Sequence, residues 1–184
     1  VDLQGLLKSA LVTRLARTSR RIGPSFHREG SRLLYSDVAG PRNKHRHAVE
    51  ECLDVLEHLG LQRPASPRFP LRLPDLPDGP GAAGAALRIA IAPRSRWPSK
   101  NWPLGHFAAL ARRIVDELGA ELHLIGGAGD RPAAEAVIRQ AGVCARNHCG
   151  EHNLGQTCAL LARMDALVAN DSGPVHMAAA VGTP

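Results

Sequence analysis

The chain has 184 residues and a mass of 19.6 kDa, a length that suits one ordinary domain or parts of two. Hydrophobic residues make up 44% of it and charged residues 22%, which excludes wholesale disorder and a fibrous repeat. The formal charge of +6 favours an anionic partner, but aromatic residues make up only 3%, so the stacking platforms that bind single-stranded nucleic acids are nearly absent.

The first part of the chain combines two predicted helices with an Arg-rich stretch between them. Apolar residues at helical spacing from Leu6 to Leu15 predict an amphipathic helix, with Arg14 and Arg17 off its apolar stripe. A second helix is expected from about His47 to Leu59, where Gly60 is a natural stop. Its expected buried face consists of Val49, Cys52, Leu53, Leu56 and Leu59. The stretch between the two helices is polar, and we expect it to be irregular.

The positive charge is concentrated in this first part. Up to His47, ten Lys and Arg residues stand against three acidic residues, whereas the remainder of the chain is nearly neutral. A one-sided basic segment favours phosphate, nucleic acid or an acidic membrane surface as a partner. The competing interpretation is a solvated basic face.

A change of composition divides the chain. Prolines and glycines recur from Pro64 to Ala86, which blocks helix formation and predicts a linker. We therefore expect a first domain at 1–63, a linker at 64–86 and a second domain at 87–184.

Beyond the linker, strands and helices alternate. Strands are expected at Arg88–Ala92, Ala120–Ile125 and Ala166–Ala169, and helices at Pro103–Leu118, Arg131–Ala141, Leu154–Arg163 and Pro174–Ala180. This alternation predicts a parallel sheet covered on both faces, as in one half of a Rossmann-like fold. Ligands bind there at the carboxyl ends of the strands, so the segments that follow the strands form the candidate site.

The segment after the first of these strands is basic. Ser95 and Arg96 can offer backbone N–H donors to a phosphate, and Lys100 can offer a mobile cation. A rigid surface loop is the structural alternative.

The segment after the second strand is rich in glycine. Gly126 and Gly127 allow a sharp turn, and Asp130 could cap the next helix or accept a hydrogen bond from a ribose hydroxyl. The segment is not G-x-G-x-x-G, so a nicotinamide nucleotide has little support.

The turn after the strand Ala166–Ala169 is the most specific of the three. Asp171, Ser172 and Gly173 lie where this strand passes into a helix. Free N–H groups and the positive end of the helix dipole predict a pocket for a diphosphate there, within reach of His176. The alternative is structural, with Asp171 or Ser172 serving as the helix cap.

The cysteines carry little functional information. The spacing of Cys144, His148, Cys149 and His152 matches no familiar zinc pattern, so we expect small buried thiols and no metal site. Without a recognisable signal peptide or an apolar run of about 18 residues, a reducing cytosolic setting is expected.

Three segments together resemble glycosyltransferase family 9, the bacterial heptosyltransferases. They are Trp97-Pro98-Ser99-Lys100-Asn101-Trp102-Pro103, Gly126-Gly127 with Asp130, and Asn170-Asp171-Ser172-Gly173-Pro174-Val175-His176 with Gly182-Thr183-Pro184. The opening segment from Asp2 to Ser9 is similar to the acceptor-side half of heptosyltransferase I in this family. The resemblance implies an α/β fold of the GT-B type, with two Rossmann-like domains that are both incomplete here, the donor bound by the second and the acceptor by the first.

The resemblance also implies an activity. It is the inverting transfer of a heptose from ADP-L-glycero-β-D-manno-heptose to Kdo-lipid A in lipopolysaccharide biosynthesis, without a metal or another cofactor. Donor contacts would come from Ser95, Arg96, Lys100, Asp130, His152, Asp171, Ser172, Gly173 and His176. Lys100 would stabilise the negative charge on the departing diphosphate. Lys8 would face the acceptor.

The resemblance sets expectations for the rest of the protein as well. The chain starts at Val1 and stops at Pro184 beside expected helices, so we expect a fragment of a larger protein that is inactive alone. The carboxylate base that takes the acceptor proton is expected upstream of Val1. The basic first part is expected to contact the anionic cytoplasmic face of the inner membrane peripherally, and no nucleic-acid partner is expected.

Two rival hypotheses stay open. Another GT-B enzyme could use a UDP-sugar on the same scaffold, in which case UDP rather than ADP would protect the protein thermally. A nucleic-acid-binding module built on the basic segment would show strongly salt-dependent binding that is lost on truncation before His47.

Overall fold

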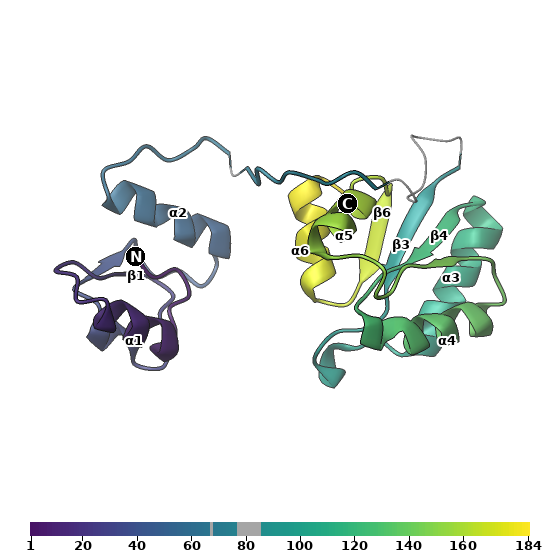
Figure 1. Cartoon of the computed structure of the whole chain (residues 1–184), viewed down its shortest axis with the longest axis horizontal. Helices are drawn as coiled ribbons and strands as arrows, with labels where there is room; N and C mark the ends of the chain where they lie inside the picture. Colours follow the sequence, from purple (N-terminus) through teal and green to yellow (C-terminus); the bar gives the residue numbers. More distant parts are fainter. Residues whose placement is uncertain (67, 77–85) are drawn as a thin grey trace. The chain divides into compact units, whose positions relative to one another are not determined.

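The structure is a computed structural model that describes residues 1–66, 68–76 and 86–184. The chain divides into two compact units, Val1–Pro67 and Arg68–Pro184 (Figure 1). The expected linker at 64–86 lies outside the described residues at positions 67 and 77–85. Among the described residues, no helix has both the length and the apolar character needed to cross a membrane.

The N-terminal unit holds two helices and a small parallel sheet. Its elements are α1 (Leu7–Leu15), β1 (Ile22–Pro24), the 3-10 helix η1 (Ser31–Leu34), β2 (Asp37–Ala39) and α2 (Ala48–His58). Both predicted helices are confirmed. The stretch between them was expected to be irregular, yet β1 and β2 pair in parallel with Gly23 opposite Val38. Strands of three residues are too short to show the alternation that identifies a strand in a sequence.

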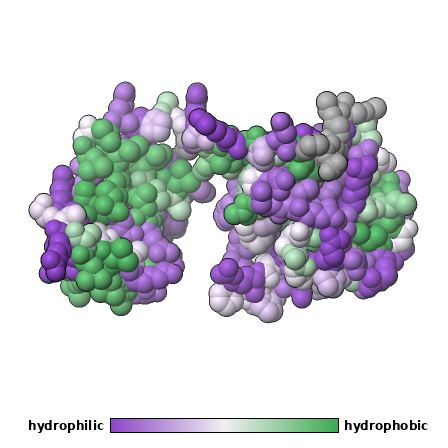
Figure 2. Space-filling model, viewed as in Figure 1, coloured by the Kyte–Doolittle hydropathy of each residue, from purple (hydrophilic) through white to green (hydrophobic). Residues whose placement is uncertain are grey.

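The predicted apolar stripe of α1 is largely exposed. Ala10 is buried, but Leu7, Leu11 and Leu15 are 41%, 46% and 77% exposed. Apolar side chains accordingly gather on the face of this unit that Figure 2 shows. Helical spacing identifies which side of a helix is apolar, but it does not show whether another element covers that side.

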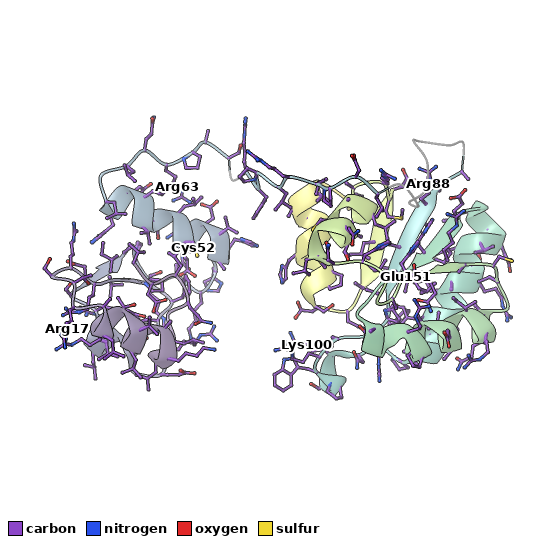
Figure 3. All side chains as sticks on the ribbon, viewed as in Figure 1. Arg17, Cys52, Arg63, Arg88, Lys100 and Glu151 are labelled. Atoms are coloured by element: carbon purple, nitrogen blue, oxygen red, sulfur yellow. The ribbon has the colours of Figure 1, made fainter. Side chains whose placement is uncertain are left out.

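The buried face of α2 also differs from the prediction. Its buried residues are Glu51, Asp54 and Val55. The positions expected to be buried are only half-buried, and Leu59 is exposed. Asp54 tolerates burial because Arg46 donates to it twice, at 2.7 Å each, and Arg63 (labelled in Figure 3) donates at 3.3 Å. A buried carboxylate is stable only when such partners compensate its lost hydration.

The second unit is built on a four-stranded parallel sheet with the order β5-β4-β3-β6. Its strands are β3 (Arg88–Ala92), β4 (Glu121–Leu124), β5 (Arg146–Asn147) and β6 (Ala166–Ala169). Its helices are α3 (Leu104–Leu118), α4 (Arg131–Ala141), α5 (Leu154–Leu161) and α6 (Gly173–Val181), with 3-10 turns η2 (Pro98–Lys100) and η3 (Ala128–Asp130). Every strand and helix predicted for this unit is confirmed to within about two residues at each end. The two-residue strand β5 was not predicted, because it is too short to show an alternation of apolar and polar residues.

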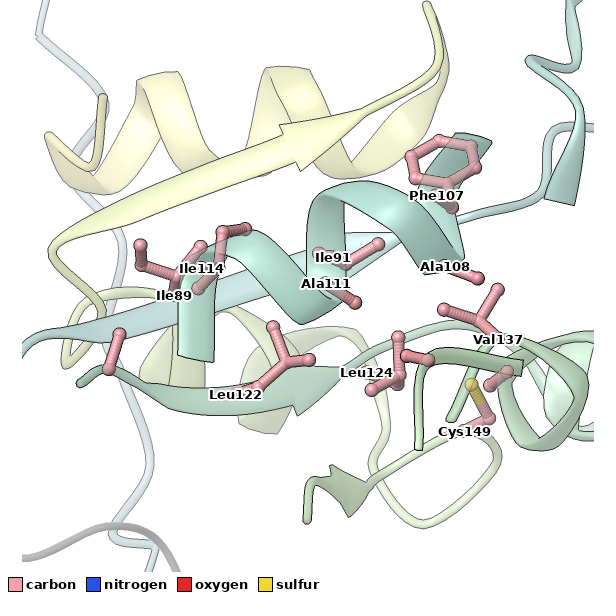
Figure 4. Packing of buried hydrophobic residues seen from close by; sticks show 13 residues of the cluster. Ile89, Ile91, Phe107, Ala108, Ala111, Ile114, Leu122, Leu124, Val137 and Cys149 are labelled. Atoms are coloured by element: carbon pink, nitrogen blue, oxygen red, sulfur yellow. The ribbon is translucent and has the colours of Figure 1, made fainter. Parts of the chain in front are cut away.

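Both faces of this sheet are covered, as predicted. Ile89 and Ile91 of β3 pack against α3 and α4 in one apolar cluster, whereas Ala90 and Ala92 face a second cluster with α5 and α6. Successive side chains of a strand point to opposite faces, so one strand serves both cores. Figure 4 shows the first cluster, in which the buried Cys149 lies near Val137.

Candidate functional site

A cavity of about 870 Å³ lies at the carboxyl ends of β3, β4 and β6. Since β4 and β6 flank β3, the chain passes to opposite sides of β3, which is the topological switch point where open parallel sheets bind ligands. All of the residues expected on the donor side line this cavity. They are Ser95, Arg96, Lys100, Asp130, His152, Asp171, Ser172, Gly173 and His176.

The loop between β3 and α3 is held by its own polar groups. The backbone N–H of Ser95 donates to Asn101 Oδ1 at 2.7 Å, and Ser95 Oγ donates to the carbonyl oxygen of Trp97 at 3.0 Å. The Ser95 donor that the sequence assigned to a phosphate is therefore used inside the loop. Arg96 is exposed on the same loop and lines the cavity.

Lys100 and Asp171 face each other across the cavity. The Lys100 ammonium donates to Asp171 Oδ2 and forms an ion pair with it, although the loops that carry them are far apart in the sequence. The hydrogen bond from Lys100 holds the pKa of the Asp171 carboxyl below its usual range. Because both side chains are solvated, this ion pair adds little to the stability of the fold. Its main effect is to hold the Lys100 ammonium at the cavity.

The first turn of α6 has no side-chain cap. Ser172 occupies the N-cap position, but its hydroxyl donates to the carbonyl oxygen of Asn170 at 3.0 Å, and Asp171 pairs with Lys100. The structural alternative for this turn is therefore met only in position, because Ser172 is the N-cap residue but neither its side chain nor that of Asp171 caps the helix. The positive end of the helix dipole faces the cavity, where an anion can accept from the backbone N–H of Gly173. Pro174 has no N–H, and the Val175 N–H donates to the carbonyl oxygen of Ser172 at 3.1 Å.

Asn170 connects the loops around the cavity, and the sequence analysis gave it no role of its own. Its buried side chain accepts from the backbone N–H of Trp102 at 2.8 Å and donates to the carbonyl oxygen of Pro93 at 3.0 Å. It thereby ties the end of β6 to the end of β3 and to the start of α3. The only signal in the sequence was an amide directly after an apolar strand.

The glycine turn after β4 is closed by Asp130. Asp130 Oδ2 accepts from the backbone N–H of Gly127 at 2.9 Å, and its side chain makes no cap to α4, contrary to one of the two expected roles. A Cβ at Gly126 would lie 2.8 Å from the same oxygen, so glycine is required there by close approach.

Three histidines form a row from the sheet to the cavity. His123 Nδ1 lies 3.0 Å from His148 Nε2, and the rings of His148 and His152 stack with their centroids 5.3 Å apart. Burial lowers the pKa of His123 to about 4, so this imidazole is neutral. His152, at the end of the row, lines the cavity.

The cysteines near these histidines do not join them. Cys149 is buried in the core beneath α4, where burial raises the pKa of its thiol to about 11, and Cys144 is exposed. The thiols therefore offer no ligand set with the histidines.

Lys8, which was expected to face the acceptor, is exposed on α1. It lines a cavity of about 530 Å³ within the N-terminal unit, together with Leu3, Gln4 and Val12. The residues of this cavity are mostly apolar or uncharged, so Lys8 is its main cationic group.

The sequence and the fold are similar to those of known enzymes. Lipopolysaccharide heptosyltransferase 2 of Escherichia coli is 40% identical over 92 residues, which are 47% of this chain and 26% of that protein. The solved E. coli ADP-heptose heptosyltransferase II is 27% identical with a TM-score of 0.70, and the match covers 97% of this chain and 59% of that one. The E. coli heptosyltransferase WaaC, solved with ADP, is 26% identical with a TM-score of 0.76 over 100% of this chain and 57% of that one.

These likenesses establish the fold class that the sequence predicted, an α/β fold with the Rossmann-like parts of the GT-B type. The chain matches only about a quarter to three fifths of the length of these relatives. The model of the family described as glycosyltransferase family 9 (heptosyltransferase) matches residues 1–184, and the chain therefore belongs to that family.

Proposed function

We propose that this chain carries the nucleotide-sugar site of a heptosyltransferase that builds the lipopolysaccharide core. The donor is ADP-L-glycero-β-D-manno-heptose. The observation that carries the proposal is one cavity at the switch point, which the Lys100 ammonium and the uncapped first turn of α6 both face. A relative solved with ADP and another described by ADP-heptose support this donor.

The chemistry of these groups suits departure of a diphosphate. As the bond from the anomeric carbon to ADP breaks, negative charge builds on the leaving phosphate while the sugar becomes oxocarbenium-like. Lys100, the Gly173 N–H and the positive end of the α6 dipole stabilise that charge from positions that the fold already fixes. We propose that the base that takes the acceptor proton is not among these residues and lies upstream of Val1.

For the acceptor we propose the Kdo-lipid A inner core of lipopolysaccharide, which is the acceptor of a heptosyltransferase I. The E. coli relatives named heptosyltransferase 2 and heptosyltransferase II instead favour the second type of enzyme. Lys8 and the basic residues before His47 would face this anionic glycolipid at the cytoplasmic side of the inner membrane. Transfer assays of the complete enzyme with each acceptor distinguish the two types.

The donor is tested by nucleotide binding to the chain itself. ADP at about 100 times its Kd should add about 2.7 kcal/mol of stability, whereas UDP should add none. Lys100→Ala should weaken ADP binding by about 10- to 100-fold, the worth of one hydrogen bond to a charged group. Lys44→Ala is the matched control, because Lys44 is an exposed lysine of the other unit.

Two results would contradict the proposal. Equal protection by UDP would favour the UDP-sugar enzyme, and ADP binding by Lys100→Ala at the parent affinity would remove Lys100 from the site. In the complete enzyme, Lys100→Ala or Asp171→Ala should abolish heptose transfer while the circular dichroism spectrum stays that of the folded protein.

A further inference from the structure

The loop between β5 and α5 brings three metal-ligating side chains together. His148, Glu151 and His152 each offer one ligand atom, and these atoms all lie within 4.8 Å of one another. Glu151 is labelled on this loop in Figure 3. The three residues line a second cavity of about 580 Å³, and His152 also lines the cavity that holds Lys100.

One pair of ligand atoms already has the spacing that a metal requires, and the third residue brings an unsatisfied nitrogen. His148 Nδ1 lies 3.4 Å from Glu151 Oε2. Two ligand atoms that are each about 2.1 Å from a tetrahedral ion are separated by about the same distance. His152 Nε2 is buried and has no hydrogen-bond partner among the described residues. A buried polar atom without a partner is costly, and an ion bound there would remove that cost.

The groups behind the ligands fix their orientation. His148 Nε2 lies 3.0 Å from Nδ1 of the buried His123, which leaves Nδ1 of His148 directed at Glu151. Arg131 donates to Glu151 Oε1 at 3.0 Å, so Oε2 is the oxygen left for an ion. Metal-binding histidines and carboxylates are held by such outer hydrogen bonds. Arg131 also offsets part of the carboxylate charge, which moderates the affinity for a cation.

We propose that His148, Glu151 and His152 bind a divalent transition metal ion, and that Zn²⁺ is the preferred ion. Two imidazoles and one carboxylate form a ligand set that suits zinc and leaves a fourth position open, here towards the second cavity. In the sequence the two histidines stand beside Cys144 and Cys149, a pattern that matches no familiar zinc site and predicts no metal. In the structure, the third ligating side chain beside the two histidines is Glu151 and not a thiol.

Zinc binding is tested with the metal-free chain and without nucleotide, so the result is independent of the proposed donor. Zn²⁺ titrated against a chromogenic chelator should bind at one ion per chain. His152→Gln and Glu151→Gln should each weaken binding by about tenfold or more. His106→Gln is the matched control, since His106 is an exposed histidine of the same unit and should leave binding unchanged.

Co²⁺ in place of Zn²⁺ reports the ligands directly. We expect visible d–d absorption without a thiolate-to-cobalt charge-transfer band, and the same spectrum in Cys144→Ser. Because His148 is buried, His148→Gln is interpreted only if its circular dichroism spectrum matches the parent. The proposal is overturned by the absence of saturable Zn²⁺ binding, by parent affinity in both His152→Gln and Glu151→Gln, or by a thiolate band that Cys144→Ser removes.

Discussion

Asn170→Ala should destabilise the second unit without removing any residue that points into the cavity of Lys100. The substitution removes both side-chain hydrogen bonds of Asn170, one from the Trp102 N–H and one to the Pro93 carbonyl. An unsatisfied buried group costs about 1–3 kcal/mol. Pro93 is fully buried, whereas Trp102 is partly solvated and can recover water. We therefore expect a loss of about 2 kcal/mol, most of it from the Pro93 carbonyl.

Urea unfolding followed by tryptophan fluorescence measures this loss selectively. The two tryptophans of the chain, Trp97 and Trp102, both lie in the second unit, so their emission reports on that unit alone. With a typical m-value of about 2 kcal/mol/M, the urea midpoint should fall by about 1 M. Asn101→Ala is the control, because the amide oxygen of Asn101 accepts from the Ser95 N–H in a part-exposed loop. It should cost about 0.5 kcal/mol.

A midpoint for Asn170→Ala within about 0.2 M of the parent would refute the reasoning, because it would mean that water or a neighbour satisfies both backbone groups. The same variant should weaken ADP binding. Asn170 directly precedes Asp171, and Trp102 lies two residues after Lys100, so the lost hydrogen bonds loosen both sides of the cavity.

Two further substitutions test local contacts. Tyr35 is the single tyrosine of the chain, and burial together with its 2.6 Å hydrogen bond to Asp2 raises the pKa of its phenol to about 12. This contribution to stability is complete below the ordinary pKa of 10 and is lost as pH rises through about 12. Ultraviolet titration of the folded chain should show the phenol ionising with this raised pKa, and in Asp2→Asn the pKa should move towards 10. A phenol pKa near 10 in the parent chain would contradict the hydrogen bond between Tyr35 and Asp2. Gly126→Ala should cost about 1–3 kcal/mol in urea unfolding because its Cβ meets the Asp130 carboxylate. Gly127→Ala should be tolerated, since the nearest atom is 3.7 Å away, and equal effects of the two would refute the argument.

The second unit was predictable from the sequence because its elements carry strong periodic signals. Ile89 and Ile91 alternate with Ala90 and Ala92 along β3, and the helices α3 and α4 are amphipathic and long enough to show their period. Parallel β–α order then places the segments after the strands at one edge of the sheet. From that rule alone, Lys100 and Asp171 are predicted to lie at the same ligand-binding edge.

The N-terminal unit was less predictable, for physical reasons. Glu51 and Asp54 are charged residues that a hydropathy pattern assigns to the surface, but Arg46 and Arg63 compensate Asp54 inside the unit. Such a pairing depends on residues that meet only after folding. The exposure of Leu11 is the converse case, an apolar residue that the described part of its unit does not cover.

For the site, the sequence predicted which residues line the same cavity, but not which hydrogen-bond partners their side chains have. Ser, Asn and Asp side chains bond readily to nearby backbone groups, so their preference is decided by the geometry of each turn. Asp130 thus closes the glycine turn instead of capping α4, and Ser172 bonds back to Asn170 instead of capping α6. As a result, neither α4 nor α6 has a side-chain cap at its start.

These choices also refine the role of Asp171. A carboxylate repels a diphosphate, so Asp171 does not attract the leaving group of the proposed reaction. Its ion pair instead holds the Lys100 ammonium at the cavity, and the lowered pKa of Asp171 extends the range in which the pair is charged to more acidic pH. Preorganised charge stabilises a developing anion without reorganisation at the moment of reaction. Asp171 thus acts through Lys100, and the part of the donor that its carboxylate can bind directly is a hydroxyl of the sugar rather than the diphosphate.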